Sequence, residues 1–147
     1  MNQLFTDLEI LDQTKKALQE MNLVEPTQIQ SLAIPKMMEG LDIIAQAKTG
    51  TGKTFAFSIP ILEKINLKNK KIQAVILTPT RELALQVYKE IVKLVKYYSE
   101  ITVIPIVGGE SYTKQFANLK KNPHIIVATP GRLIVHIDRN TIDLSSL

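Results

Sequence analysis

Residues 43–54 read IIAQAKTGTGKT, an apolar run followed by a glycine-rich segment that ends in Lys53 and Thr54. The apolar run at 43–46 favours a buried strand, and apolar residues at helical spacing follow Lys53. The glycines therefore fall in a strand-to-helix turn, where backbone N–H groups converge on phosphate groups at the start of a helix. This stretch predicts an α/β fold with a nucleotide site.

The residue types in this segment suit phosphate binding, and we call residues 47–54 the phosphate loop. Gly50 and Gly52 allow backbone angles closed to other residues and let the main chain approach a ligand. Lys53 is expected to neutralise the β- and γ-phosphates, and the Thr54 hydroxyl to bind Mg²⁺. Against the pattern G-x-x-x-x-G-K-[ST], the first position holds Ala47. A plain turn with an incidental lysine is the competing interpretation, which the flanking elements disfavour.

Beyond the phosphate loop, short apolar runs alternate with longer segments of helical period. The predicted strands cover 43–46, 72–78, 102–107 and 124–128, and the predicted helices cover 53–65, 81–98, 111–120 and a segment from Pro130. Strands that are apolar on both faces, joined by crossover-length helices, indicate a parallel sheet with helices on both faces. We therefore predict a partial nucleotide-binding α/β domain over 42–147, preceded by a helical segment over 1–41.

The helical segment has two predicted helices. The first covers 12–21 with Asp12 as its cap, and the second follows Thr27 and stops at Gly40. In this second helix, Gln30 can both donate and accept, which matches the N6 and N7 groups of adenine and not the two acceptors of guanine. Phe5 offers a ring that could stack on the base. A surface glutamine and a core phenylalanine are the ordinary alternatives.

Three further loops follow predicted strands at their carboxyl ends, where open α/β sheets bind ligands. They are PTRE at 79–82, GG at 108–109 and TPGR at 129–132. Thr80 and Thr129 can cap helices, and Pro130 suits a first helical turn. The exposed N–H groups, with Arg81 and Arg132, could bind phosphate oxygens of a sugar-phosphate backbone without reading its bases. Each loop taken alone is also an ordinary helix start or turn.

The composition is that of a globular protein, with 45% hydrophobic and 22% charged residues in 147. The absence of cysteine excludes disulfides and thiolate metal sites. No apolar run approaches the roughly 18 residues that span a bilayer, and the amino terminus has no basic signal segment. We therefore expect a reducing, cytoplasmic setting without a membrane partner. The net charge of +4 is compatible with a polyanionic partner.

Taken in order, Phe5, EPTQIQ, AQAKTGTGKT, PTRELALQ, GG and VATPGR closely resemble the amino-terminal half of a DEAD-box RNA helicase over nearly the whole chain. The resemblance implies a RecA-like P-loop domain that uses ATP and Mg²⁺ and binds the RNA backbone with little sequence preference. The ATP-binding residues that it implies are Phe5, Thr27, Gln30, Ala47, Lys48, Thr49, Gly50, Thr51, Gly52, Lys53 and Thr54, with Thr54 also a metal ligand. The implied RNA-binding residues are Pro79, Thr80, Arg81, Glu82, Gly108, Gly109, Thr129, Pro130, Gly131 and Arg132.

The chain departs from the family pattern at three positions. Asn22 and Leu23 stand where the family usually has glycine and an aromatic residue, and Val135 replaces an acid often seen there. Hydrolysis also needs a carboxylate that holds Mg²⁺ and a group that orients water. The nearest candidate, Asp138, should lie on the helix that begins at Pro130, so we do not expect it to bind magnesium.

The resemblance implies that the hydrolytic carboxylates lie elsewhere. In the family, Asp-Glu-Ala-Asp follows within a few residues of the position of Leu147, and a strand from beyond that position pairs with the phosphate-loop strand. A second RecA-like domain completes the ATP site. We therefore expect this chain to be the truncated first domain of an ATP-dependent RNA helicase, poorly stable and without turnover alone. A complete small non-hydrolysing nucleotide- or RNA-binding regulator is the alternative. A small-molecule kinase is disfavoured because it has no use for EPTQIQ and TPGR.

Overall fold

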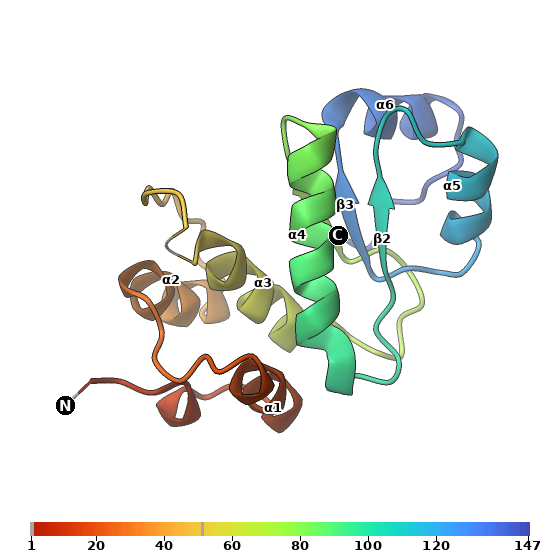
Figure 1. The fold of residues 1–147 in the computed structure, drawn as a ribbon. Coiled ribbons are helices and arrows are strands. Elements are labelled where there is room, and N and C mark those ends of the chain that lie inside the picture. The colour runs from red at the N-terminus through yellow and green to blue at the C-terminus, as the bar shows by residue number, and fades with distance from the viewer. Residues whose placement is uncertain (1, 51) are drawn as a thin grey trace. The chain divides into compact units, whose positions relative to one another are not determined.

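The computed structural model describes residues 2–50 and 52–147 (Figure 1). The elements are η1 (Phe5–Asp7), α1 (Asp12–Glu20), α2 (Gln28–Met38), α3 (Lys53–Lys64), β1 (Ala74–Leu77), α4 (Arg81–Leu94), η2 (Val95–Tyr97), β2 (Val103–Ile106), α5 (Tyr112–Leu119), β3 (Ile125–Ala128) and α6 (Pro130–Asp138). The chain divides into a first unit, Met1–Lys64 with Lys93–Ser99, and a second unit, Ile65–Val92 with Glu100–Leu147. A domain boundary after residue 41 stays a prediction.

The second unit contains a parallel sheet in the order β1-β3-β2. All four residues of β3 are buried, as expected of a central strand covered on both faces. In Figure 1, α4 lies on one side of β2 and β3 and α5 on the other. The α/β class and three of the four predicted strands are thereby confirmed.

A hydrophobic cluster in the second unit consists mainly of isoleucine, in part on strands β2 and β3. Its buried members are Ile72, Ile104, Ile106, Ile126, Ala128 and Leu133. β-Branched side chains have few rotamers to lose and pack well on a pleated surface, so these apolar runs form strands. No helix in the described parts of the chain is long and apolar enough to cross a membrane.

The predicted strand at 43–46 is wrong for this structure. Residues 41–48 form no regular element, and the side chain of Ile44 is fully exposed. A strand requires ladder hydrogen bonds to a neighbouring strand, and the described residues supply no such partner for this segment. The apolar pattern indicates a tendency to be buried, which does not by itself provide the pairing.

Helix α1 is capped by a side chain from another helix and not by Asp12, which is its first helical residue. The N-cap residue is Leu11, whose N–H donates to both carboxylate oxygens of Glu63 at 3.0 Å. The Thr14 hydroxyl donates to the same carboxylate at 3.1 Å. Burial raises the pKa of Glu63, although the bonds from Leu11 and Thr14 act to lower it. An anion at a helix amino terminus also interacts favourably with the helix dipole.

Three helices end on asparagine in the left-handed region, at φ +58° for Asn22, +55° for Asn122 and +53° for Asn140. At the end of α1, the N–H of Leu23 donates to the carbonyl of Leu18 at 2.9 Å, which closes the helix. Asparagine tolerates this conformation better than other residues with a Cβ atom. Asn22, which stands where the family usually has glycine, therefore adopts the backbone conformation that a glycine would adopt.

The predicted helix starts are partly confirmed. Thr27 caps α2 through a reciprocal pair with Gln30, and the Thr80 hydroxyl accepts from the N–H of Leu83 at 3.2 Å. Thr129 is the N-cap residue of α6 but makes no side-chain cap bond, so that expectation is wrong. Its backbone makes the connection instead, because its N–H donates to Ile106 in β2 at 3.1 Å.

Candidate functional site

The phosphate loop lies in the first unit and opens α3, as predicted from the sequence. Gly50 and Gly52 have φ angles of +79° and +86°, both in the region that favours glycine. Thr51, one of the predicted ATP-binding residues, lies outside the described residues. The two glycine angles fit a loop that turns its N–H groups toward a ligand.

Lys53 reaches back across the loop that precedes it. Its Nζ donates to the backbone carbonyl of Ala47 at 2.7 Å, and its side chain is exposed. The ammonium group therefore bonds an acceptor oxygen at the loop's own first residue. Thr54, in the first turn of α3, has a partly exposed side chain, and its carbonyl accepts from the Ser58 hydroxyl at 2.6 Å.

Gln30 joins α2 directly to the phosphate loop. Its Oε1 accepts from the N–H of Thr27 at 2.9 Å, and its Nε2 donates to the carbonyl of Gly52 at 3.0 Å. The side chain is 3% exposed. An amide has two hydrogens and two acceptor lone pairs, so one donor and one acceptor position remain after these bonds.

Gly52 is required for space as well as for its backbone angle. A Cβ atom at this position would lie 2.3 Å from Nε2 of Gln30 and 3.0 Å from Oγ1 of Thr27. A Cβ atom at Gly50 would meet nothing within 4 Å. The predicted adenine-reading residues and the phosphate loop are therefore packed against each other at Gly52.

A cavity of about 530 Å³ lies between α2 and the start of the phosphate loop. Its walls are Thr27, Gln28, Ile29, Leu32, Gln46, Ala47 and Lys48. Phe5 is 3% exposed, with its N–H bonded to the carbonyl of Val24 at 2.9 Å. The ring of Phe5 is thus a core anchor in this structure, and stacking on a base would require it to be uncovered.

In the second unit, the three predicted RNA-binding loops start at one edge of the sheet. Leu77 at the end of β1 and Ile106 at the end of β2 are both in register with Ala128 at the end of β3. The strands are parallel, so the loops that follow them emerge at the same level. Pro79, Thr80 and Glu82 are exposed at the start of α4.

Arg81 packs directly on the second glycine of the GG loop. Gly109 has a φ of +77°, and a Cβ atom there would lie 2.6 Å from Nη1 of Arg81. By contrast, a Cβ atom at Gly108 or Gly131 would meet no atom within 4 Å. Of these three glycines, only Gly109 is constrained by a neighbour.

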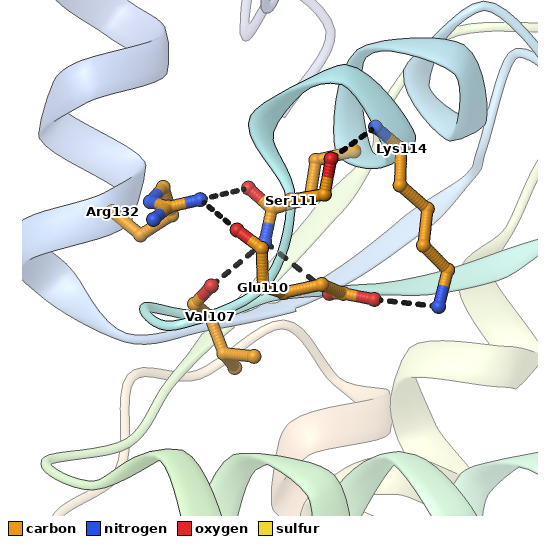
Figure 2. Close-up of polar contacts among 6 residues, drawn as sticks. Val107, Glu110, Ser111, Lys114 and Arg132 are labelled. Atoms are coloured by element: carbon orange, nitrogen blue, oxygen red, sulfur yellow. Dashed lines mark hydrogen bonds and ion pairs between the residues drawn. The ribbon is translucent and has the colours of Figure 1, made fainter.

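Arg132 contacts the same turn from the first turn of α6. Its Nη1 donates to the carbonyl of Glu110 at 2.8 Å and to Oε1 of Gln115 at 3.0 Å. Figure 2 shows the guanidinium group directed at the turn that carries Glu110. Two arginines, one at the start of α4 and one in the first turn of α6, therefore adjoin the Gly108–Glu110 turn and place positive charge beside it.

Sequence reasoning missed the polar residues that support this turn. Gln115 is fully buried, and its Nε2 donates to the carbonyl of Val107 at 2.7 Å and to the Glu110 carboxylate at 3.3 Å. Burial raises the pKa of Glu110, but hydrogen bonds from Lys114 and Gln115 outweigh it and lower the pKa overall. The available signal was a glutamine on the buried face of an amphipathic helix.

Asp138 lies in α6, as predicted from the helix start at Pro130, and its side chain is exposed. Within residues 2–50 and 52–147, no group of three or more His, Asp or Glu side chains could hold a metal ion. Thr54 is left as the predicted metal-binding residue of this chain.

The chain resembles known helicases over nearly all of its length. It is 47% identical over 140 residues to the DEAD-box ATP-dependent RNA helicase CshA of Geobacillus kaustophilus, covering 95% of this chain and 30% of that protein. It is 46% identical over 141 residues to the ATP-dependent RNA helicase DeaD of Mycobacterium tuberculosis, covering 96% of this chain and 25% of that protein. The chain therefore spans between a quarter and a third of the length of these curated relatives.

A solved structure and a family model agree with these relatives. The crystal structure of a DEAD box protein from the hyperthermophile Methanococcus jannaschii matches 98% of this chain and 39% of that one, at 41% identity and a TM-score of 0.91. The likeness confirms the predicted RecA-like α/β fold. The model described as DEAD/DEAH box helicase matches residues 27–147. The chain belongs to the DEAD/DEAH box helicase family.

Proposed function

We propose that this chain carries the ATP-binding loop and the RNA-backbone-binding loops of an ATP-dependent RNA helicase that opens short duplexes locally. The observation that carries the proposal is the hydrogen bond from Gln30 to Gly52, because it joins an adenine-reading amide to a phosphate loop. The names of the relatives support the same activity. A second RecA-like domain of the whole protein would complete the ATP site.

The phosphate loop has the features that binding of a nucleoside triphosphate requires. Gly50 and Gly52 hold the backbone angles that let adjacent N–H groups face phosphate oxygens. Lys53 exchanges the carbonyl of Ala47 for phosphate oxygens as its partner. Mg²⁺ keeps several water ligands and needs few protein ligands, so the Thr54 hydroxyl is a sufficient contribution from this loop. ATP, when bound, supplies the phosphoanhydride bond whose hydrolysis drives the helicase cycle.

Gln30 would give the site its preference for adenine. Its remaining N–H can donate to N7 of adenine and its remaining lone pair can accept from N6. Guanine presents O6 in place of the N6 donor, which would leave the Gln30 oxygen facing another acceptor. Because Gln30 is hydrogen-bonded to Gly52, a shift of the Gln30 side chain on binding the base would also move the phosphate loop.

The second unit would bind the sugar-phosphate backbone. Arg81 and Arg132 supply charge beside the Gly108–Glu110 turn, and the amino termini of α4 and α6 supply N–H groups. None of these groups reads a base edge, so affinity should depend on salt and little on sequence.

Equilibrium dialysis with radiolabelled ATP tests the nucleotide site. We expect Lys53→Ala to weaken binding by about ten-fold or more, since it removes a charge-assisted hydrogen bond to phosphate. Lys36→Ala, which removes an exposed lysine from α2, is the matched control and should bind as the wild type does. Gln30→Ala should reduce the preference for ATP over GTP. Equal ATP affinity in the Lys53 and Lys36 variants would contradict the proposal.

Filter binding of a short single-stranded RNA tests the backbone loops. We expect Arg81→Met and Arg132→Met each to weaken binding and to lower the salt dependence by about 0.7 for each phosphate that is no longer neutralised. Lys89→Met, on the exposed surface of α4, serves as the control for loss of one positive charge. The chain should also release no phosphate from ATP, and turnover that disappears in Lys53→Ala would refute the absence of hydrolysis.

A further inference from the structure

Gln115 is at the centre of a buried polar network that holds the Gly108–Glu110 turn by hydrogen bonds. Gln115 is fully buried and makes hydrogen bonds to four residues. Its Nε2 donates to Val107 and Glu110, and its Oε1 faces Nη1 of Arg132 at 3.0 Å and Nε2 of His136 at 2.9 Å. One side chain of α5 therefore joins the end of β2, the turn after it, and α6.

The partners fix which way the Gln115 amide points. The carbonyl of Val107 can only accept a hydrogen bond, and so can the ionised carboxylate of Glu110. Both must therefore face the Nε2 end, which leaves Oε1 for Arg132 and His136. Rotating the amide by half a turn would set acceptor against acceptor at Val107 and Glu110 and donor against donor at Arg132.

The orientation of Gln115 also fixes the tautomer of His136. Because Oε1 only accepts, Nε2 of His136 must carry a hydrogen. Burial, followed by the charges of Arg132 and Arg139, lowers the pKa of His136, which favours the neutral ring. Nδ1 then accepts from the Thr141 hydroxyl at 2.7 Å, the shorter of that hydroxyl's two contacts with His136.

Arg132 is held in this network through one nitrogen. Both hydrogens of Nη1 are taken, one by the carbonyl of Glu110 and one by Gln115. Among the described residues no hydrogen bond uses Nε or Nη2 of Arg132, and the Nε hydrogen with one Nη2 hydrogen forms a planar edge that can bind two oxygens of a phosphate group. An arginine fixed in this way loses less rotamer entropy on binding than a free one.

We propose that Gln115 is a positioning residue for RNA-backbone binding, which holds Arg132 and the Gly108–Glu110 turn as one preformed anion-binding unit. The inference rests on the proposed RNA-binding function of these loops. Gln115 does not touch the RNA in this scheme and acts through Arg132.

The test is a double-mutant cycle, in which RNA filter binding is measured for the whole natural protein and for its variants at Gln115 and Arg132. Gln115→Met keeps the length of the side chain and removes its hydrogen bonds. We expect this variant to weaken RNA binding several-fold and, combined with Arg132→Met, to cause no further loss. Gln19→Met, at an exposed glutamine of α1, is the matched control. ATP affinity, which belongs to the first unit, should not change in any of these variants.

The outcomes separate the two proposals. If Gln115→Met binds RNA as the wild type does, or if its loss adds in full to that of Arg132→Met, the positioning role is overturned while RNA binding stands. A wild-type protein without measurable RNA affinity would overturn the proposed function itself and this inference with it.

A second measurement needs no variant and so is independent of the folding of Gln115→Met. Nitrogen NMR of the wild-type protein should show His136 as the neutral tautomer with the hydrogen on Nε2. The side-chain amide hydrogens of Gln115 should exchange slowly with solvent. A hydrogen on Nδ1 of a neutral His136 would overturn the orientation of Gln115 on which the inference depends.

Discussion

Replacing Gly52 with alanine measures how tightly the phosphate loop is packed on Gln30. The new methyl group would enter the space now held by the Gln30 amide, 2.3 Å from Nε2 and 3.1 Å from the amide carbon. This contact cannot be tolerated, and Gln30 is buried, so its amide must move away from Gly52. We therefore expect Gly52→Ala to break the hydrogen bond between the two residues.

The size of the effect follows from two contributions. A left-handed backbone costs a residue with a Cβ atom about 1 to 2 kcal/mol. Leaving the buried Gln30 amide without its acceptor costs about 1 to 3 kcal/mol more. Gly52→Ala should then lower the free energy of unfolding by about 2 to 5 kcal/mol. Gly50→Ala, at a similar φ but in open space, should lower it only by the first contribution.

Urea denaturation followed by circular dichroism is the suitable assay, since the chain has no tryptophan for fluorescence. The decisive comparison repeats Gly52→Ala in a Gln30→Ala background, where the obstructing amide is gone. There the cost of Gly52→Ala should fall to that of Gly50→Ala. Equal costs for the two glycines in the wild-type background would refute the packing argument.

Three further predictions concern stability. Asn22→Gly should leave the urea midpoint unchanged or raised, whereas Asn22→Ala should cost about 1 kcal/mol; equal midpoints would contradict the left-handed cap. Glu63→Ala should cost about 1 kcal/mol because α1 loses its cap, and Glu63→Gln, which keeps an acceptor, should cost less in the same assay. Burial lowers the pKa of His124 below 6.5, so the unfolded chain takes up the proton first, and unfolding free energy should fall as pH drops below that value. His124→Gln should weaken this dependence of the unfolding free energy on pH. An unchanged dependence would show that His124 is not its source.

The sequence was sufficient for features set by neighbouring residues. The glycine angles of the phosphate loop, the cap at Thr27 and the helix from Pro130 each depend on a few adjacent positions, and the structure confirms them. The parallel direction of the three strands followed from crossover-length helices, since such connections favour parallel pairing.

Features that join distant positions could not be predicted in the same way. The carboxylate that caps α1 belongs to Glu63, 52 residues after Leu11. The buried bonds of Gln115 reach Arg132 and His136 in another helix, and no local pattern names those partners. Residues 43–46 failed as a strand for the same reason, because pairing requires a neighbour that periodicity cannot specify.

The common register of the strand ends sets a fixed spacing between the loops that follow the strands. Neighbouring strands lie about 4.8 Å apart, so the loops after β1 and β2, on either side of β3, start about 10 Å from each other. Backbone hydrogen bonds fix that interval, and substitutions in the loops can change the strength of each anchor without moving it. If RNA binds across this edge as proposed, the sheet sets the spacing of its contacts, and that spacing does not depend on the bases.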